Sequence, residues 1–462
     1  MTSPTHAARR RQLAEAMRAA GGGLAVMPTA PERQRSSDVV HPYRHDSHFH
    51  YLCGFDEPAA WLLIDASGRS TLLCREKNPE LEIWEGLRLG PAAAPEALGV
   101  DEAHAVDGLD SLLVQRLANQ PAVWFPFGVH PELQAQIDGW LAALRRRDRG
   151  GDECPGAQRD LNPLLAEMRL VKDSAEIATM RRAAGISAGA HARAMRFCAE
   201  RLRTQPQDGL REYEIEAELL HEFRRHGAQG PAYPSIVAAG ANACVLHYAA
   251  AGAELRGGEL CLIDAGCELD GYASDITRTF PANGRFSAAQ RELYDIVHAA
   301  QEAAVAATHP GARQRDAHWA AVRVLAQGML DTGLLDRNQA GDAEAVIESG
   351  AYRQFYMHGT GHWLGRDVHD VGEYASLGET PVEQLDGQGG RVVKKPSRVL
   401  QPGMVVTVEP GLYVRPAPGV PERYWNIGIR IEDDAVVTES GCELISRGAP
   451  VAALEIEALM RA

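Results

Sequence analysis

The sequence predicts two domains: an α/β domain at the N-terminus, then an α+β domain with antiparallel hairpins. With 462 residues, 45% of them hydrophobic, the chain is longer than one ordinary domain and can bury a large core. Up to about residue 170, apolar strand-like runs alternate with helical stretches, as is typical of α/β domains. Farther along, long helical patterns give way to β-branched runs at hairpin spacing.

In the N-terminal part, we expect strands at residues 59–68 and 70–76 and a helix at residues 110–120. The segment at residues 145–160, RRRDRGGDECPGAQRD, is rich in charge, Gly and Pro, which predicts a loop or linker. We therefore place the domain boundary between this segment and Lys172, with the N-terminal domain at residues 1–171 and the second at 172–462.

The second domain begins with a helix from Ser174 to about Leu202, because Asp173 and Glu176 have the spacing of a capping box. A second helix is expected to end at Gly227, a residue type that favours the left-handed helix terminus. Further elements follow in order: strands at 234–240, 259–266 and 271–280, helices within 288–333, and strands at 405–414 and 426–438. Residues 373–398 are rich in Gly and polar residues and predict a surface excursion.

Composition excludes some functions and favours others. A net charge of −15 and a pI near 5.6 disfavour general binding to nucleic acid or to an anionic membrane. No apolar run approaches the ~20 residues that span a bilayer. The eight cysteines contain no CxxC pair, and the N-terminus lacks a secretory signal, so a reducing cytoplasm is the expected location.

Five residues differ in kind from the segments that hold them: Asp264, Asp275, His362, Glu409 and Glu432. Three of these segments read as apolar strands, where an acid is costly unless a cation or hydrogen-bond donors compensate it. Each residue alone is more often a turn, cap, loop or surface residue. Their coincidence indicates a metal site.

Strand alternation predicts which side chains face this site. The groups that share a face are Asp275 with Thr277 and Thr279, Thr407 with Glu409, and Gly428 with Arg430 and Glu432. Acids on adjacent strands repel, and two divalent ions relieve this better than one. A hard ligand set with one imidazole suits manganese, iron(II) or cobalt, and a pair of such ions predicts metal-assisted hydrolysis.

Histidines cluster near His362. In MHGTGHWLGRDVHDVG, His358 and His369 accompany it among glycines that allow close backbone approach, which favours a site with both ligand and non-ligand imidazoles. Two other motifs are rejected as sites. The GISAG sequence around Ser187 lies in a helical pattern, and HEFRRH spaces its histidines five apart, so they diverge by roughly 140° around a helix.

The assembled motifs resemble the pita-bread metallopeptidases, and within them the Xaa-Pro aminopeptidases (aminopeptidase P). The segments that carry the resemblance are IDAGCELDGYASDITRTFP, MHGTGHWLGRDVHDVG, LQPGMVVTVEPGLYV, VPERYWNIGIRIEDD and, near the N-terminus, HPYRHDSHFHYLCGFDEP. The resemblance implies a creatinase-type N-terminal α/β domain. It also implies a pita-bread catalytic domain with a pseudo-twofold arrangement, in which two metal ions lie on a curved antiparallel sheet.

The resemblance also implies roles. The five residues singled out above would bind two divalent ions, expected to be Mn²⁺, with Asp275 and Glu432 bridging them. A bridging hydroxide would attack the carbonyl before a penultimate proline of a peptide substrate, and Glu409 would carry its proton. His358, His369 and His247 would contact the substrate, and Arg430 would hold the surrounding carboxylates.

Alternatives stay open at this stage. Two features leave a dipeptidase of the prolidase type possible. Gly361 stands where aminopeptidase P members often have Ser, and residues 373–398 form a long stretch. In that case Arg391, Lys394 or Lys395 would meet the substrate carboxylate. A non-catalytic binding protein is disfavoured, because all five ligands are present.

Two further expectations concern the proline pocket and the assembly. Tyr233, Trp363 and Tyr413 are candidates for the wall of a proline pocket, and each could equally belong to the core. Trp84 resembles a segment that reaches toward another subunit, which implies a homo-oligomer, either a dimer or a tetramer.

Overall fold

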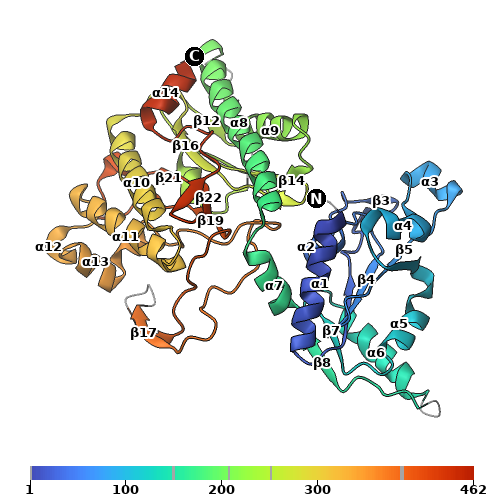
Figure 1. Cartoon of the computed structure of the whole chain (residues 1–462). Coiled ribbons are helices and arrows are strands. Elements are labelled where there is room, and N and C mark those ends of the chain that lie inside the picture. The colour runs from blue at the N-terminus through green and yellow to red at the C-terminus, as the bar shows by residue number, and fades with distance from the viewer. Residues whose placement is uncertain (1–2, 148–150, 206–208, 250–251, 386–389, 462) are drawn as a thin grey trace. The chain divides into compact units, whose positions relative to one another are not determined.

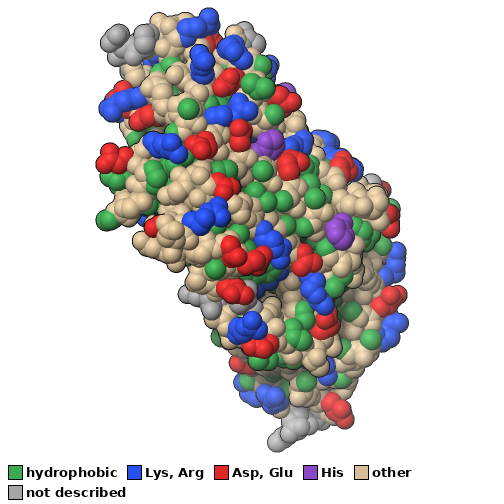
Figure 2. All heavy atoms as spheres, turned by 90° about the vertical axis from the view of Figure 1, so that its left-hand side faces the viewer, with side chains coloured by type: hydrophobic (Ala, Val, Ile, Leu, Met, Phe, Trp, Pro, Cys, Tyr) green, Lys and Arg blue, Asp and Glu red, His purple; other side chains and the backbone are tan. Residues whose placement is uncertain are grey.

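The computed structural model describes residues 3–147, 151–205, 209–249, 252–385 and 390–461. The chain divides into two compact units, Met1–Met168 and Arg169–Ala462 (Figure 1). Within the described part of the chain, every helix is too short or too polar to span a lipid bilayer. On the face drawn in Figure 2, acidic side chains lie among basic ones.

One mixed sheet organises the first unit, with the strand order β6-β5-β4-β1-β7-β8. Its strands are β1 (Leu24–Pro28), β4 (Trp61–Asp65), β5 (Ser70–Cys74), β6 (Glu102–Ala105), β7 (Ala122–Phe125) and β8 (Ala157–Asp160). Strand β1 is antiparallel to β4 and parallel to β7, while β6 and β8 extend the two edges in parallel. A short pair, β2 (Gln34–Ser36) and β3 (Val39–Val40), lies outside this sheet.

Helices pack on both faces of the sheet because its strands alternate their apolar side chains. Along β4, Leu62 and Ile64 join one core cluster, whereas Trp61 and Leu63 join the other. Residues of α1, α2, α4 and α7 belong to the first cluster, and those of α5 and α6 to the second. The helices are α1 (Ser3–Ala19), α2 (Ser47–Cys53), α3 (Pro79–Glu85), α4 (Gly90–Leu98), α5 (Leu109–Leu117), α6 (Leu133–Arg145) and α7 (Asn162–Leu170).

The loop predicted at residues 145–160 is wrong at its end, where Ala157–Asp160 form strand β8. This strand lies at the sheet edge with β7 as its partner. None of its residues is fully buried, so polar side chains are tolerated there and the sequence carries no apolar signal. Residues 148–150 of the predicted loop lie outside the described residues.

Long helices frame the second unit. Helix α8 begins at the predicted capping box, in which Asp173 accepts from the backbone of Glu176 and Glu176 accepts from that of Asp173. Gly227, which follows α9, has a φ of 88°, in agreement with the predicted left-handed terminus. The helices are α8 (Ser174–Thr204), α9 (Glu212–Arg225), α10 (Ala288–Ala307), α11 (Gln314–Asp331), α12 (Arg337–Ala340), α13 (Ala343–Ser349) and α14 (Ala453–Arg461).

Small antiparallel sheets fill the second unit. The strand groups are β11-β13-β16, β10-β14-β15, β19-β22-β23, β20-β21, β9-β12 and β17-β18. Their bounds are β9 (Leu210–Arg211), β10 (Gly230–Pro231), β11 (Ile236–Ala239), β12 (Glu254–Leu255), β13 (Leu260–Asp264), β14 (Cys267–Leu269), β15 (Tyr272–Ala273), β16 (Thr277–Pro281), β17 (Val382–Leu385), β18 (Arg391–Lys394), β19 (Val405–Val408), β20 (Gly411–Val414), β21 (Ile427–Arg430), β22 (Asp433–Val437) and β23 (Cys442–Leu444).

The predicted pairing across residues 264–275 is present with an added detail. Strands β13 and β16 pair antiparallel, with Asp264 opposite Thr277. The connection between them forms its own small hairpin, β14–β15, instead of a single turn. Strand β16 also contacts β21, since Thr279 accepts from the backbone of Arg430 at 3.2 Å and donates to its carbonyl at 3.0 Å. The acid-bearing segments are thereby brought side by side.

Residues 373–398 contain the hairpin β17–β18, whose tip at residues 386–389 lies outside the described part. The base of this excursion is held by a backbone hydrogen bond from Ser376 to Pro396 at 2.8 Å. Its strands are solvent-facing, with Val382 46% and Val393 73% exposed. The described residues agree with the predicted surface position.

Candidate metal centre

A pocket of about 600 Å³ in the second unit brings the predicted site residues together. Its lining includes Asp264, Asp275, His362, Glu409 and Glu432, together with His247, His358, His369 and Arg430. The acids come from the ends of different strands. Asp264 ends β13, Glu409 directly follows β19, and Glu432 lies two residues beyond β21. Strand ends therefore deliver carboxylates to one point from segments far apart in the sequence.

Three of these residues lie at the spacing of a shared cation. One ligand atom each from Asp275, His362 and Glu432 lies within 4.8 Å of the other two. The His362 Nε2 atom is 3.4 Å from Asp275 Oδ2 and 3.8 Å from Glu409 Oε1. Its Nδ1 atom lies 3.0 Å from the Trp363 carbonyl oxygen, which orients the ring with Nε2 toward the acids.

The pocket concentrates negative charge. Burial raises the pKa of Glu409 to about 7 and that of Glu432 well above its ordinary value. Burial also raises the pKa of Asp275, although His362 acts against it. For His362 itself, burial lowers the pKa, but Asp275 and Glu409 outweigh this effect and raise it to about 9. The neighbouring cationic side chains do not balance the charge of these acids, so the donor set fits divalent cations.

Arg430 is the principal cation of the protein beside these acids. Its Nη2 atom donates to Asp264 Oδ2 at 2.6 Å, and its Nε atom donates to Thr277 Oγ1 at 3.1 Å. The Thr277 hydroxyl in turn donates to Glu432 Oε2 at 2.6 Å. These contacts orient two carboxylates, as outer partners of metal ligands do. The shared face of Arg430 and Glu432, and the pocket-facing position of Thr277, follow the predicted alternation.

The opposite faces of the same strands carry a separate ion pair. Arg278 and Asp433, each with a fully buried side chain, lie 2.7 Å apart between Nη2 and Oδ1. Each is one residue from a group that serves the pocket, so alternation sends the neighbouring charges to opposite sides. This pair stabilises the junction between β16 and β22 without entering the site.

The role of Tyr233 was missed by sequence reasoning, which considered it only for an apolar wall. Its hydroxyl hydrogen-bonds to Asp264 Oδ1 at 2.7 Å and also to Asp275 Oδ1. Burial and the charges of these acids raise its pKa well above 10, so it stays a proton donor. No local pattern around PAYPS distinguishes this tyrosine from a core residue.

The other histidines lie around the acids. The His358 Nε2 atom is 2.8 Å from the Tyr413 hydroxyl, and burial together with Arg430 lowers the pKa of His358 to about 3. The rings of His362 and His369 are 4.2 Å apart, and burial followed by the charge of His362 lowers the pKa of His369. These two imidazoles are therefore neutral at physiological pH.

A buried ion cluster holds the loop that carries His369. Asp370 lies next to it and pairs with Lys172 at 3.0 Å and with Arg169 at 2.5 Å, all with side chains at most 2% exposed. Arg169 also reaches Asp367 at 2.7 Å. The start of the second unit is thus tied to one wall of the pocket.

Two candidates for the pocket wall occupy other positions. Trp363 is fully buried and stacks on Tyr374 at 5.5 Å, so it belongs to the core. Tyr413 is also buried, and its hydroxyl accepts from Arg430 at 3.1 Å. The space beside the acids is instead lined by apolar side chains that include Ile236, Leu246 and Val368.

The rejected motifs lie outside the site. Ser187 is buried within α8, and its hydroxyl is 2.7 Å from that of Ser274. His226 lies at the end of α9, where its Nε2 atom is 2.8 Å from Glu222.

Gly361 permits close approach to β19, because a Cβ atom there would come within 1.9 Å of the Thr407 carbonyl oxygen.

Comparisons with known proteins agree with this geometry. Residues 178–439 match the model of metallopeptidase family M24, and residues 6–124 match that of the aminopeptidase P N-terminal domain. The chain is 44% identical to Escherichia coli Xaa-Pro aminopeptidase over 98% of this chain and 96% of the relative. It is 31% identical to human Xaa-Pro aminopeptidase 3 over 94% of this chain and 80% of the relative.

The structure is similar to that of aminopeptidase PepP of Pseudomonas aeruginosa, with a TM-score of 0.90 and 43% identity over 100% of this chain and 98% of the other. Together with the family matches, this similarity confirms the predicted fold class: a creatinase-type α/β domain followed by an α+β pita-bread domain with a curved antiparallel sheet.

Proposed function

Because the chain belongs to metallopeptidase family M24, we propose that it is an Xaa-Pro aminopeptidase that uses two divalent ions. It removes the first residue from peptides whose second residue is proline. The residues that would hold the ions are Asp264, Asp275, His362, Glu409 and Glu432. The relatives named Xaa-Pro aminopeptidase, which this chain matches nearly end to end, support the substrate class.

The observation that carries the proposal is the convergence of buried acids and one imidazole in a single pocket. Asp275, His362 and Glu432 present ligand atoms within 4.8 Å of one another. Burial holds the pKa values of the carboxylates above their ordinary range, which is costly unless cations compensate them. When bound, divalent ions held by these residues would activate a water molecule for attack and polarise the substrate carbonyl.

The chain's own residues would move protons and orient the peptide. Glu409 lies in the pocket with its Oε1 atom 3.8 Å from His362 Nε2, and it would accept the proton of the nucleophile and return it to the leaving nitrogen. His358, His369 and His247 line the pocket and would contact the substrate carbonyl or the scissile nitrogen. Arg430 would keep Asp264 and, through Thr277, Glu432 in position.

Manganese is the proposed metal, because carboxylates with a single imidazole form a hard ligand set. The preference for proline is consistent with the apolar side chains Ile236, Leu246 and Val368, which can receive the ring. A proline nitrogen has no proton to donate, so recognition depends on this shape.

The aminopeptidase is favoured over the dipeptidase by the position of residues 373–398. Among the described residues that line the pocket, none comes from this excursion. Arg391 is instead on hairpin β17–β18, where its side chain is 69% exposed and lies 4.0 Å from Glu383. The structure therefore gives no support for a contact between Arg391 and a substrate carboxylate in this pocket.

The test compares an Xaa-Pro dipeptide with an Xaa-Pro-Xaa tripeptide by mass spectrometry. Metal-stripped protein is assayed with and without Mn²⁺, and Glu432→Ala serves as the ligand-deficient control. Release of the first residue from the tripeptide, dependent on Mn²⁺ and lost in the variant, is expected. Turnover of the dipeptide alone would assign a prolidase, and no turnover of either would contradict the proposal.

Three further parts of the proposal concern the whole chain. We place the functional domain division at residues 171/172, directly before the helix α8 that opens the catalytic domain. A homo-oligomer, a dimer or tetramer, is proposed because Ile83, Trp84 and Leu87 form an apolar group that is 81–86% exposed. None of the eight cysteines, all of which lie within the described residues, forms a disulfide, which supports a reducing cytoplasm as the location.

A further inference from the structure

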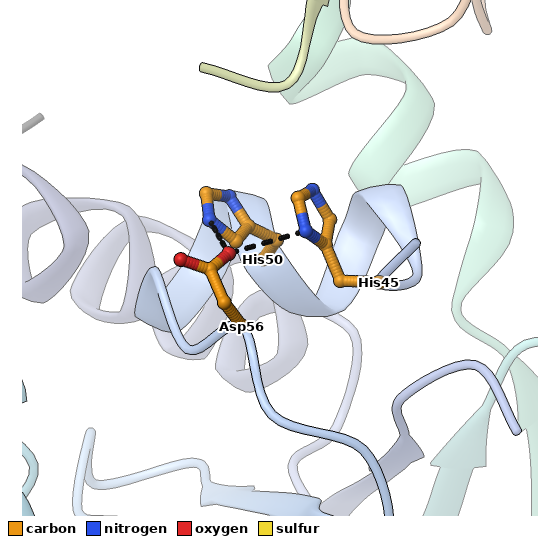
Figure 3. Close-up of side chains that lie close together, drawn as sticks. All are labelled: His45, His50 and Asp56. Carbon is orange, nitrogen blue, oxygen red and sulfur yellow. Dashed lines mark ion pairs between the residues drawn. The ribbon is translucent and has the colours of Figure 1, made fainter. Parts of the chain in front are cut away.

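A second group of candidate metal ligands lies in the first unit. His45, His50 and Asp56 each present one ligand atom, and these atoms lie within 4.8 Å of one another. Figure 3 shows both imidazoles directed at the same carboxylate. The His50 Nε2 atom is 2.8 Å from Asp56 Oδ1, and the His45 Nδ1 atom is 3.2 Å from the same oxygen.

Helix α2 fixes the spacing of this group. Asp46 caps the helix by accepting from the backbone of Phe49 at 2.8 Å, so His45 immediately precedes the first turn. Gly54 ends the helix in the left-handed conformation and turns the chain back, which brings Asp56 alongside His50. His45 therefore lies just before this short helix, His50 lies within it, and Asp56 lies just after it.

Packing makes the helix a rigid support. Phe49 and Leu52 are fully buried in the core of the first unit, which places His50 on the opposite, outer side of α2. The His6 ring lies edge-on to the His50 ring, with centroids 6.3 Å apart, and the His6 Nδ1 atom is 3.1 Å from the Tyr51 carbonyl oxygen. Neighbours of this kind restrict the orientation of a ligand imidazole.

The spacing suits a small divalent cation. Ligand bonds of about 2.0–2.2 Å in tetrahedral geometry place neighbouring ligand atoms roughly 3.4 Å apart. The observed nitrogen–oxygen separations of 2.8 and 3.2 Å are shorter than this value and also match direct hydrogen bonds, so Asp56 would move slightly outward to admit a cation. The two imidazole rings stack at 3.8 Å with an interplanar angle of 16°, so the His45 ring, which precedes α2, must turn for both nitrogens to aim at one cation.

The exposure of the side chains describes an open site. The imidazoles of His45 and His50 are only 12% and 14% exposed, whereas the carboxylate of Asp56 is 73% exposed. A cation bound here would be held against the protein by two nitrogens and would keep a coordination position toward solvent. Three protein ligands with a fourth open position are a recurrent arrangement for zinc.

We propose that His45, His50 and Asp56 form a Zn²⁺-binding site in the first unit, separate from the centre in the second unit. Two imidazoles with one carboxylate favour Zn²⁺ over Mn²⁺, both by donor type and by the general order of divalent-metal affinities. The catalytic proposal has the opposite donor balance, with four carboxylates and one imidazole. The site does not depend on the proposed function.

The competing account is a carboxylate that accepts hydrogen bonds from two imidazoles and binds no metal. In that account the N–H groups of His45 and His50 point at the Asp56 carboxylate, in the space where a cation would otherwise bind. The two accounts differ in one measurable quantity, the number of Zn²⁺ ions bound per chain.

The experiment measures bound Zn²⁺ after equilibrium dialysis of the full-length, metal-stripped protein, using plasma mass spectrometry. Wild type is compared with His50→Gln and with Asp56→Asn, each of which removes one proposed ligand. His41→Gln is the matched control, because His41 is an exposed histidine of the same segment outside the cluster. Far-ultraviolet circular dichroism verifies that each variant is folded.

The expected result is one Zn²⁺ per chain fewer in His50→Gln and Asp56→Asn than in wild type, with no change in His41→Gln. The difference between proteins is the readout, so Zn²⁺ bound at the proposed catalytic centre cancels. Equal Zn²⁺ content in folded wild type and both ligand variants would overturn the proposal and leave the hydrogen-bonded cluster. If Asp56→Asn alone is folded, its content decides. The experiment does not measure peptide hydrolysis, so failure of the Zn²⁺ proposal is distinguishable from failure of the proposed function.

Discussion

At the scale of single residues, Tyr233 joins two of the proposed ligands. Its hydroxyl bonds to Asp264 and Asp275, so it limits the positions of both carboxylates. Tyr233→Phe is expected to weaken Mn²⁺ binding by ~10–100-fold, the usual cost of removing an outer partner of a metal ligand. Competition with a metal-sensitive dye measures the affinity. Tyr248→Phe is the control, because Tyr248 lines the same pocket while its hydroxyl donates to Glu212.

Unchanged Mn²⁺ affinity in Tyr233→Phe would mean that the tyrosine only fills space beside the acids. Equal weakening in both variants would indicate that general loss of packing, and not the hydroxyl, causes the effect.

His191 predicts how stability changes with pH. Burial lowers its pKa to about 4, with Arg278 acting in the same direction and the Ala265 carbonyl, Asp264 and Asp433 opposing. The unfolded residue titrates near pH 6.5, so between pH 6.5 and 4 only the unfolded chain binds this proton. The free energy of unfolding should therefore fall as pH drops through this window, by up to about 3 kcal/mol from His191 alone.

Urea unfolding of metal-stripped protein at pH 7.5 and pH 4.5 measures this effect without metal release. The loss of stability between the two pH values should be smaller in His191→Gln than in wild type. An equal loss in both proteins would exclude His191 as the cause.

Single residues also show what could be predicted from the sequence. The five proposed ligands could be found because each is a polar residue in an apolar or Gly-rich segment, and strand alternation fixed their shared faces. Tyr233 could not be found, because a tyrosine beside prolines looks the same whether its hydroxyl meets acids or solvent. Its role depends on the approach of two distant strands.

At the scale of elements, the loop that carries His369 depends on a buried ion cluster. Asp370 pairs with Lys172 and Arg169, and removing the acid would leave the buried Lys172 uncompensated and take from Arg169 one of its two acids, the other being Asp367. Asp370→Ala is expected to lower the free energy of unfolding by ~3–5 kcal/mol. Chemical denaturation measures the loss. Asp367→Ala removes an acid whose own side chain is 35% exposed, so it should cost clearly less. Equal losses would show that burial of Asp370 does not matter.

The order of elements followed from the sequence more reliably than their edges. The capping box and Gly227 mark the limits of α8 and α9 through local chemistry, which acts within a few residues. Strand β8 was missed because its partner β7 lies more than thirty residues away, and edge pairing does not require apolar residues. The nested hairpin β14–β15 was missed for a related reason, since two short pairings replace one turn.

At the scale of the whole molecule, an apolar group on the first unit predicts self-association. Ile83, Trp84 and Leu87 lie at and after the end of α3 and are 81–86% exposed. Trp84→Ala is expected to shift the protein toward smaller assemblies, because an aromatic anchor is often central to an interface. Light scattering during size-exclusion chromatography measures the mass. Leu454→Ala, a single exposed residue on α14, should leave the mass unchanged.

A monomeric wild type would contradict the oligomer proposal directly. An oligomer whose mass is the same in Trp84→Ala would place the interface on another surface.

The central claim is that five residues from distant strands and one loop hold two metal ions in a single pocket. Anomalous diffraction at the manganese edge from crystals grown with Mn²⁺ tests it most directly. The account predicts two peaks in this pocket, within bonding distance of Asp264, Asp275, His362, Glu409 and Glu432. A single peak there, or none, would contradict the dinuclear centre.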